Sequence, residues 1–528
     1  MSVIAVVLLV IPLVVAVAAF WLPPQAGGAI TAVAGVASFG LVLALIDTLS
    51  GRDVAALDFI RIDALSGVFM LATSFLYASV AVYSIGYLRS GTAAPRYSRR
   101  FWTGLNIFAW SMLAAPAMSN LALLWVAIEV TTIVSALLVA LEGTDGAVEA
   151  AWKYVLLASA GLAVALLATI FLYYAGATAL GSSYNLAFAP LLSAAGRLPA
   201  TVVRLAFVLA VLGFGTKVGL FPVHTWLPDA HSEAPTPVSA LLSGSLLAVS
   251  FYAILRFYQI TAASLGSQFP RDVLLAFGIA SLLLAALYLL DQHDYKRLLA
   301  YSSVEHMGIL AIGVSFGVPV ALAGVLLHVL AHAAAKGNAF MGAGVLVRKF
   351  GTKQISGVSG GLDVLPWSGP LLLVAVLALS ALPPFGIFRS EFEIVSGGLA
   401  ASRDVAAVGL VVLVTIAFLG LSFAANRMLL MPARSTRKSA DGRGADGGGS
   451  GGGGADGRGA DGGGADGRGA DGRGADGRGA AVVRGEPSAW MVVPVVVGVV
   501  ALLVLGLHPP GELLGLLNRA VAALQGPA

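Results

Sequence analysis

The feature that most constrains this chain is the recurrence of apolar stretches long enough to cross a lipid bilayer. About 20 apolar residues span the hydrocarbon core as a helix, and the sequence contains fourteen such stretches. They lie at residues 2–21, 28–48, 64–88, 103–119, 121–141, 154–176, 203–221, 237–259, 271–290, 298–316, 319–347, 369–388, 405–431 and 489–507. Because long apolar runs satisfy their backbone hydrogen bonds in lipid as helices, they predict an all-α, polytopic membrane protein with about 14 transmembrane helices.

The composition supports this class and excludes several functions. Hydrophobic residues make up 58% of the 528-residue chain and charged residues 11%, against about 25% charged residues in soluble domains. The chain has no cysteine, which excludes disulfides, thiolate zinc sites, Cys-ligated iron–sulfur clusters and catalytic thiols. The net charge of +4 does not indicate nucleic-acid binding, because basic residues beside membrane helices report topology. The first stretch lacks a basic n-region, so we interpret it as a retained helix.

Basic residues between the stretches predict the orientation. Cytoplasmic loops of membrane proteins are enriched in lysine and arginine, and four connections here are basic. Their residues are Arg89, Arg96, Arg99 and Arg100; Lys296 and Arg297; Arg348, Lys349 and Lys353; and Arg427, Arg434, Arg437 and Lys438. With fourteen helices all four connections fall on one side, so we expect that side to be cytoplasmic and both termini to lie outside. The same count places residues 432–488 in the cytoplasm.

Eight consecutive pentapeptides at residues 440–479 form a low-complexity tract. Most read ADGRG, and 20 of the 64 glycines lie here. The tract contains no apolar residue larger than alanine, so it cannot build a core and is typical of a flexible linker. A phosphate-binding loop is not indicated, because no strand precedes the glycines. The expected organisation is an N-terminal three-helix segment (1–100), a first half (101–260), a second half (261–431), the loop (432–488) and a last helix with its tail (489–528).

Four charged residues lie within apolar stretches. A charge inside a membrane costs at least about 2.5–3.5 kcal/mol, so it is a functional hypothesis by default. The four are Glu129, Lys217, Lys336 and Glu391. Two structural alternatives stay open: Lys217 could extend its amine to the membrane surface, and Glu391 could be an interfacial loop residue between Arg389 and Glu393.

Prolines interrupt two of these regions. Pro222 follows Lys217 by five residues, and Pro383 with Pro384 precedes Glu391. Discontinuous helices at matching places in two halves indicate an inverted-repeat transporter. We therefore expect two inverted five-helix repeats, helices 4–8 and 9–13, with helices 7 and 12 broken, and a hydrated path at each break.

Histidines add a candidate proton relay. His328, His332 and Lys336 are spaced by four residues and share one helix face. Imidazole titrates near neutral pH and exchanges protons through either nitrogen, so the stripe predicts a relay; satisfied core histidines, a metal site without an evident further ligand, or a haem are the alternatives. The helix-7 break adds His224, Asp229 and His231, of which Asp229 and His231 could instead cap and brace the loop.

Three segments carry a family resemblance. TKVGLFPVHTWLPDAHSEAPTPVSALLSG resembles the broken-helix signature of the antiporter-like membrane subunits of respiratory complex I, and DYKRLLAYSSVEHMG and HVLAHAAAKGNAFMGAG are similar to two later helices of that family. The family is related to multisubunit sodium/proton antiporters and group 4 [NiFe]-hydrogenases. SEAPTPVSALLSG and SSVEHMG most resemble the F-type subunit of hydrogenase-4 and formate-hydrogenlyase complexes.

The resemblance implies proton translocation driven by redox partners. On this basis Glu129 and Lys217 match the charged residues of the family's fifth and seventh helices, and Lys336 and Glu391 those of its eleventh and twelfth. The chain departs from the family in helix 8, where many members have His or Lys and this sequence offers only Ser243, Ser245 and Ser250. With water, His231 could substitute for the missing bridge. A second substitute is the pair Glu305 and His306.

The expected function is therefore that of a non-redox, proton-pumping subunit of an oxidoreductase or hydrogenase complex. The proton path would run through Glu129, Lys217, Lys336 and Glu391, with a Glu129–Lys217 pair as its switch. No cofactor or metal is expected in this chain, while partner subunits would carry NiFe and iron–sulfur centres. The alternatives are a subunit of a multisubunit Na⁺/H⁺ antiporter and a non-pumping structural subunit of the membrane arm.

Overall fold

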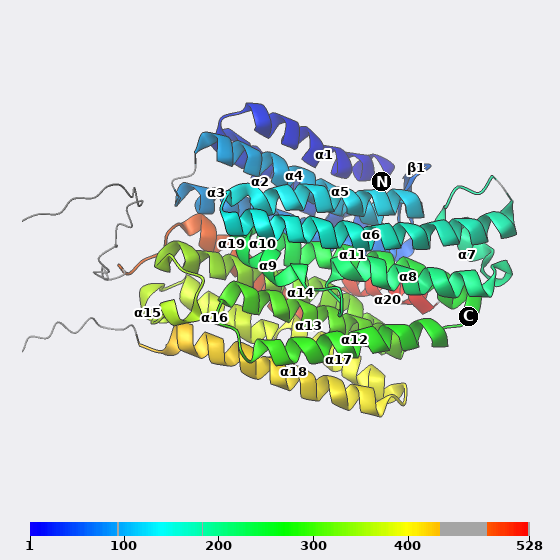
Figure 1. Cartoon of the computed structure of the whole chain (residues 1–528). Coiled ribbons are helices and arrows are strands. Elements are labelled where there is room, and N and C mark those ends of the chain that lie inside the picture. The colour runs from blue at the N-terminus through cyan, green and yellow to red at the C-terminus, as the bar shows by residue number, and fades with distance from the viewer. Residues whose placement is uncertain (92–93, 182, 433–482, 526–528) are drawn as a thin grey trace, which may run out of the picture.

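The computed structural model describes residues 1–91, 94–181, 183–432 and 483–525. It shows a bundle of long helices that lie side by side (Figure 1). The prediction of a polytopic all-α membrane protein is confirmed. The pentapeptide tract at 440–479 lies outside the described residues.

The helices follow one another with short connections. The N-terminal segment contains α1 (Ser2–Trp21), α2 (Pro24–Gly51), β1 (Val54–Leu57), β2 (Ile60–Ile62) and α3 (Ala64–Arg89). The next segment contains α4 (Pro95–Ala117), α5 (Leu121–Val139), η1 (Ala140–Glu142), α6 (Asp145–Leu180), α7 (Phe188–Ser193), η2 (Ala195–Arg197), α8 (Ala200–Val218), α9 (Trp226–Glu233), α10 (Thr236–Leu241), η3 (Leu242–Leu246) and α11 (Leu247–Leu265).

The second half and the C-terminal part continue the bundle. They contain α12 (Gln268–Leu289), α13 (Tyr295–Phe316), α14 (Pro319–Phe350), η4 (Ile355–Gly357), α15 (Gly361–Val364), α16 (Ser368–Leu379), α17 (Gly386–Ala400), α18 (Asp404–Ala425), η5 (Asn426–Leu430), α19 (Ala489–Leu507) and α20 (Gly511–Gln525). Both η3 and η5 are π-helical turns.

Each of the fourteen predicted stretches coincides at least in part with a helix. Among the described residues, twelve helices are long and apolar enough to cross a membrane. The other two stretches fall in α4, which begins with Arg96, Arg99 and Arg100, and in α16, which has only 12 residues. Fourteen crossings therefore stay a prediction, as do the inverted repeats.

Two chain breaks lie where the prolines are. α8 ends at Val218 and is capped by Gly219, whose φ of +83° suits glycine, and the chain resumes its helix only at Trp226. The second break separates α16 from α17, so the predicted stretch 369–388 is split and a further helix follows it. The polar residues of α17 kept it out of the predicted spans, and the hairpin β1–β2 and the amphipathic α20 were not predicted either.

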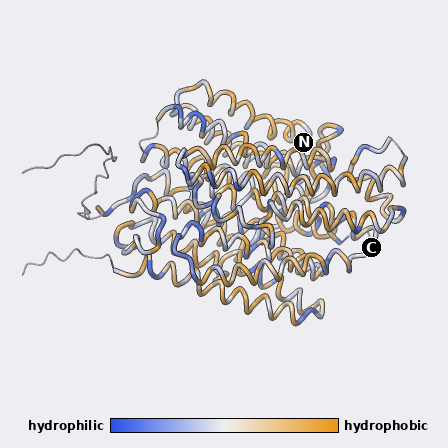
Figure 2. Tube along the Cα trace, in the orientation of Figure 1, coloured by the Kyte–Doolittle hydropathy of each residue, from blue (hydrophilic) through white to orange (hydrophobic). Residues whose placement is uncertain are grey.

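The central helices differ from the peripheral ones in burial. The most apolar 18 residues of Thr236–Leu265 and of Tyr295–Phe316 are wholly buried within the chain, whereas those of α18 are mostly not buried. Figure 2 shows mainly hydrophobic residues along the long helices, as a lipid-facing bundle requires. The helices α13 and α14, which carry Glu305 and Lys336, are thus largely screened from lipid by other helices.

Residues 485 and 486 are fixed to the bundle. Glu486 caps α16: its Oε1 accepts from the backbone N–H groups of Trp367 and Ser368, both at 2.9 Å. Lys349 Nζ donates to the Gly485 carbonyl at 2.7 Å. The end of the predicted loop 432–488 therefore packs against the start of α16.

Candidate functional site

Lys217 lies at the end of α8, in a pocket of hydroxyl groups. Its side chain has no exposed surface, so the alternative in which its amine reaches the membrane surface is wrong. Nζ donates to Tyr154 Oη at 2.5 Å and to Thr132 Oγ1 at 3.1 Å. Ser135 Oγ donates to the Thr131 carbonyl at 2.5 Å, so it accepts the hydrogen of Tyr154 across 2.8 Å.

Glu129 lies one helical turn before Thr132 on α5. Its side chain is half-buried, and its Oε1 accepts from Ser159 Oγ at 3.3 Å. Among the described residues, the ion pairs within 4.0 Å do not include a Glu129–Lys217 pair. The amine instead contacts the hydroxyls of Tyr154 and Thr132, and the Glu129–Lys217 switch stays a hypothesis.

Lys336 lies in the middle of α14. It has no exposed surface. Its Nζ donates to the Leu299 carbonyl at 2.9 Å and to Ser302 Oγ, both on α13. Glu305 follows Ser302 by three residues on α13; it is buried, and its Oε2 has no hydrogen-bond partner among the described residues.

Three histidines from two helices lie together beside Lys336. His306 Nδ1 of α13 is 3.1 Å from His328 Nε2 of α14, and the ring centroids of His306 and His332 are 5.1 Å apart. His328 Nδ1 is 2.9 Å from Ser390 Oγ, which donates its hydrogen to the Ile387 carbonyl. The serine must accept from His328, so Nδ1 of His328 carries a proton and its Nε2 accepts from His306.

Glu391 on α17 completes this cluster. Its Oε1 is 3.9 Å from His306 Nδ1, and the residue is 7% exposed. Arg389 and Glu393 pair with each other at 3.0 Å instead of with Glu391. The alternative of Glu391 as an interfacial loop residue is therefore wrong.

The same cluster corrects one point about metals. The sequence showed no further ligand for the His328–His332 pair, but His306, His328 and Glu391 place one donor atom each within 4.8 Å of the others. Two imidazoles and a carboxylate are ligands that zinc accepts. This donor set needs three helices that are distant in sequence, so spacing along α14 could not indicate it. His332 does not belong to it.

The segment between α8 and α10, which contains the predicted helix-7 break, holds the remaining predicted residues. Asp229 pairs with Lys153 at 3.4 Å and with Arg297 at 3.2 Å, and so braces the loop. His231 is buried, and its Nδ1 donates to the Leu227 carbonyl at 2.8 Å, which leaves Nε2 as the acceptor. His224 is 7% exposed and lies beside Phe221.

Sequence reasoning missed several polar residues of the site. Lys296 was interpreted as a loop residue, yet it is 3% exposed and its Nζ donates to the carbonyls of Ser232 and Ala234 at 2.8 and 2.6 Å. These carbonyls lie at the C-terminal end of α9, before α10 begins. The hydroxyls of Thr132, Tyr154 and Ser302 were missed as well, because hydroxyl residues are common in apolar helices.

Residues 117–418 match the family described as the NADH:quinone oxidoreductase/Mrp antiporter transmembrane region. This matched range contains all the buried charges described above. The chain belongs to this family. It is thus an antiporter-like, multi-span membrane protein.

Relatives and solved structures agree with the family. A hydrogenase-4 component F homolog from Methylacidiphilum infernorum (isolate V4) is 38% identical over 362 residues, which cover 68% of this chain and 76% of that protein. A chain of respiratory complex I from Thermus thermophilus with bound NADH superposes with a TM-score of 0.76 at 25% identity, covering 100% of both chains. A chain of the Mrp complex from Dietzia sp. DQ12-45-1b gives a TM-score of 0.78 at 19% identity over 99% of this chain and 97% of that one, a likeness in fold.

Proposed function

We propose that this chain is the proton-translocating membrane subunit of a redox-driven complex of the group 4 hydrogenase or complex I type. The observation that carries the proposal is the pair of fully buried lysines, Lys217 and Lys336, each held by hydroxyl or carbonyl oxygens. A buried amine that is not in an ion pair costs insertion free energy without stabilising the fold. A lysine that binds and releases a proton gives a functional reason for that cost.

In the first half the hydroxyls support transfer from Lys217. The Tyr154 oxygen accepts from the amine and its hydrogen points to Ser135. A proton that leaves Lys217 for Tyr154 can therefore be matched by one that leaves Tyr154 for Ser135. The half-buried Glu129 would bias the amine through its charge as it gains or loses its own proton.

In the second half the histidines form a hydrogen-bonded chain that supports proton transfer. A proton added to His306 Nε2 allows Nδ1 to pass its hydrogen to His328 Nε2. His328 can then release its Nδ1 hydrogen to Ser390 Oγ as the serine releases its own hydrogen to transient water. The Glu391 carboxylate, 3.9 Å from His306, would stabilise the imidazolium form.

His231 is our candidate for the link between the halves. It lies on α9, and its ring centroid is 6.2 Å from that of Trp226 and 5.7 Å from that of Phe340 on α14. The Trp226 ring in turn contacts Tyr154, with ring centroids 4.4 Å apart. Its Nε2 is buried and has no hydrogen-bond partner among the described residues. An imidazole nitrogen with a free lone pair can take up a proton without first breaking a bond.

Energy must come from outside this chain. Moving one charge across the membrane is worth about 2.3 kcal/mol per 100 mV, and the sequence contains no recognisable nucleotide motif or cysteine ligand. We assign the redox step to partner subunits with NiFe and iron–sulfur centres, as the relationship to a hydrogenase-4 component F homolog supports. In this proposal the basic connections and residues 432–488 face the cytoplasm of a cell membrane, and both termini face outside.

The test uses the complete complex in proteoliposomes, with proton uptake and electron transfer measured together. We expect Lys217→Ala and Glu129→Gln to abolish coupled proton pumping while the complex still assembles. Arg403→Gln is the matched control, because Arg403 pairs with Asp272 at the surface and should leave pumping unchanged.

Three other outcomes would contradict the proposal in different ways. Wild-type pumping by both variants would remove the assignment. Sodium-driven pH changes by the purified chain alone would indicate a self-contained antiporter. Normal pumping after neutralisation of Glu129, Lys217, Lys336 and Glu391 together would indicate a structural subunit.

A further inference from the structure

A cavity of about 940 Å³ opens at the end of the bundle where α3 begins. Its walls come from the hairpin β1–β2, α7, the end of α11 and the last turn of α20. At its base Arg256 Nη2 contacts Asp63 Oδ2 at 2.7 Å. Burial alone would raise the pKa of Asp63, but Arg256 and the hydrogen bond from Ser66 bring this pKa below its ordinary value. The base of the cavity therefore holds an ionised pair at neutral pH.

Hydroxyl groups continue from this pair into the bundle. Arg256 Nε donates to Tyr252 Oη at 2.9 Å, and Tyr252 Oη lies 3.0 Å from Ser66 Oγ. Tyr252 is on α11 and Ser66 on α3, so the hydroxyl pair bridges the two helices. Ser66 and Tyr252 thus form a hydroxyl pair beside the cavity at the α3–α11 interface, which we call the first polar station.

A second polar station lies deeper along the same interface. Thr73 Oγ1 and Ser245 Oγ are 2.7 Å apart. Thr73 follows Ser66 by seven residues, and Ser245 precedes Tyr252 by seven residues. Seven residues correspond to about 10.5 Å along a helix. Ser245 belongs to the π-helical turn η3, and π-turns often mark functional sites.

The same π-turn reaches the Lys336 cluster. Ser243 Oγ lies 2.7 Å from Ser303 Oγ of α13. Ser303 donates to the Leu299 carbonyl at 3.2 Å, and this carbonyl also accepts from Lys336 Nζ at 2.9 Å. Gly244 lies between the two serines and faces Leu76 and Ala333. The π-turn η3 therefore carries two serine hydroxyl contacts, Ser245 with Thr73 and Ser243 with Ser303.

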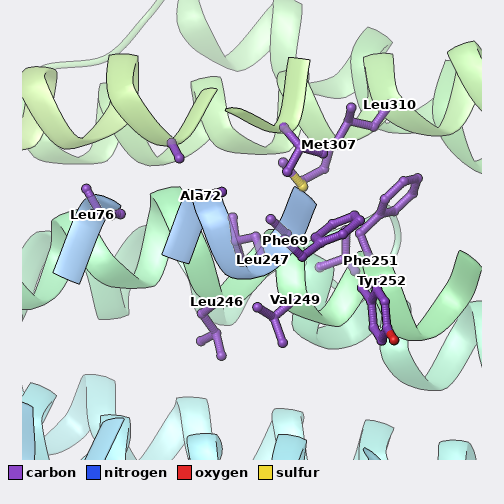
Figure 3. Packing of buried hydrophobic residues seen from close by; sticks show 14 of the residues in the cluster. Phe69, Ala72, Leu76, Leu246, Leu247, Val249, Phe251, Tyr252, Met307 and Leu310 are labelled. Carbon is purple, nitrogen blue, oxygen red and sulfur yellow. The ribbon is translucent and has the colours of Figure 1, made fainter. Parts of the chain in front are cut away.

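Apolar side chains close the interval between the two stations. Phe69 of α3 packs edge to face on Tyr252, with ring centroids 5.3 Å apart. Figure 3 shows Phe69 beside Phe251 and Tyr252, with Met307 of α13 approaching from the other side. All are buried, and a narrow apolar constriction blocks water and protons until it is hydrated.

We propose that protons leave Lys336 toward the cavity along the α3–α11 interface, through the hydroxyls of Ser303, Ser243, Ser245 and Thr73, and that Phe69 and Met307 gate the outlet. The inference rests on the proposed function and adds the outlet, its gate and a role for Ser243 and Ser245 of η3. The proton passes between hydroxyls and transient water to the cavity, where the ionised Asp63–Arg256 pair lines the outlet.

The first experiment removes the deeper station in the reconstituted complex. Thr73→Val with Ser245→Ala keeps the side-chain volume but loses the hydroxyl pair, and we expect protons pumped per electron to fall by about tenfold or more. Ser250→Ala is the control, because Ser250 bonds only to the Leu246 carbonyl of its own helix at 3.0 Å and should pump normally. Wild-type pumping by the double variant overturns the outlet.

The second experiment opens the gate. Phe69→Ser and Met307→Ser should each raise passive proton leak through the resting complex under an imposed potential by about tenfold, because polar side chains hydrate the constriction. The chain has no cysteine, so Ser245→Cys gives a further readout that leaves the gate intact. We expect this cysteine to react with a thiosulfonate reagent from the cavity side during turnover and to be protected at rest, with Ser250→Cys unreactive throughout.

The outcomes separate the two proposals. If Lys217→Ala abolishes pumping while the double variant pumps normally, the gate variants stay tight and Ser245→Cys stays protected during turnover, the outlet is wrong and the proposed function stands. If Lys217→Ala pumps normally, the proposed function fails whatever the gate variants do.

Discussion

At the scale of residues, the site holds its buried amines with hydroxyls and carbonyls. A carboxylate in direct contact would stabilise the charged lysine by Coulomb attraction, and the proton would then be harder to release. A hydroxyl donates or accepts equally well, so it stabilises both the amine and the ammonium form. Tyr154 holds this position at Lys217, and Ser302 holds it at Lys336.

The Tyr154 hydroxyl can be tested apart from its ring. Tyr154→Phe should keep the packing on Trp226 and the contact of the ring with Lys217 Nζ, which is 4.9 Å from the ring centroid. Loss of the hydroxyl should lower the pumping rate by about 100-fold or more, as expected for a positioned proton-transfer group, with electron transfer and assembly retained. Tyr184→Phe is the control, because the Tyr184 hydroxyl donates to the Ala187 carbonyl at 3.3 Å in the connection between α6 and α7. Equal pumping by both variants would show that the hydroxyl is dispensable.

The sequence predicted the buried Lys217, Lys336 and Glu391 but missed Lys296 and the hydroxyls. A charge in an apolar stretch is conspicuous because its insertion is costly. Serine and threonine hydroxyls satisfy themselves on a carbonyl one turn back, as Ser84 does on Val80 at 2.7 Å, so they leave no such signal. The contact of His306 with His328 joins two helices and could not follow from spacing on either.

At the scale of elements, the prolines predicted the positions of both chain breaks correctly. The helix α17, which follows the second break, was not predicted as a span because it is polar. α17 carries Arg389, Glu391 and Glu393 in one turn, and a hydropathy threshold rejects such a segment. It lies inside the bundle because α14, α18 and α19 pack against it. Only these tertiary contacts make the segment a buried helix.

Close packing between α6 and α8 positions Lys217 beside Tyr154. A Cβ at Gly213 of α8 would collide with the backbone of Ala165 on α6. Gly213→Ala should therefore separate the helices, lower stability by about 1–3 kcal/mol and weaken pumping. Thermal unfolding of the solubilised complex and pumping assays test this.

Gly409→Ala is the matched control for that substitution. Gly409 lies within α18, and a Cβ there meets no atom within 4 Å. Alanine should leave stability unchanged or raise it by about 0.5–1 kcal/mol through helix propensity. If the two variants behave alike, close approach of α6 and α8 is not what positions Lys217.

At the scale of the whole molecule, hydropathy predicted the membrane class, but it could not predict which helices are central. α11 and α13 are wholly buried, whereas α18 is mainly exposed, although α18 is the more apolar of the three. The buried helices carry polar residues because they face one another across the proposed path. Apolar content therefore reports exposure to lipid and not depth within the protein.

The chain is anchored on both sides of the long insertion. The Gly360 N–H donates to the Met431 carbonyl at 2.8 Å, and the Gly485 N–H donates to the Val364 carbonyl at 2.9 Å. Both attachment points thus lie within one short segment, residues 360–364, around α15. The ends are held near each other by the folded bundle itself.

This arrangement predicts that the 50 residues from 433 to 482 can be removed. Replacing them with a Gly/Ser linker of about ten residues should preserve assembly and proton pumping. The free energy of unfolding should rise by on the order of 1 kcal/mol, because a shorter loop loses less entropy on closure. Glu486→Ala in the shortened chain serves as the contrast, since it removes the cap of α16 and should cost about 1–2 kcal/mol. Loss of pumping on shortening, with assembly intact, would show instead that the pentapeptide tract takes part in coupling.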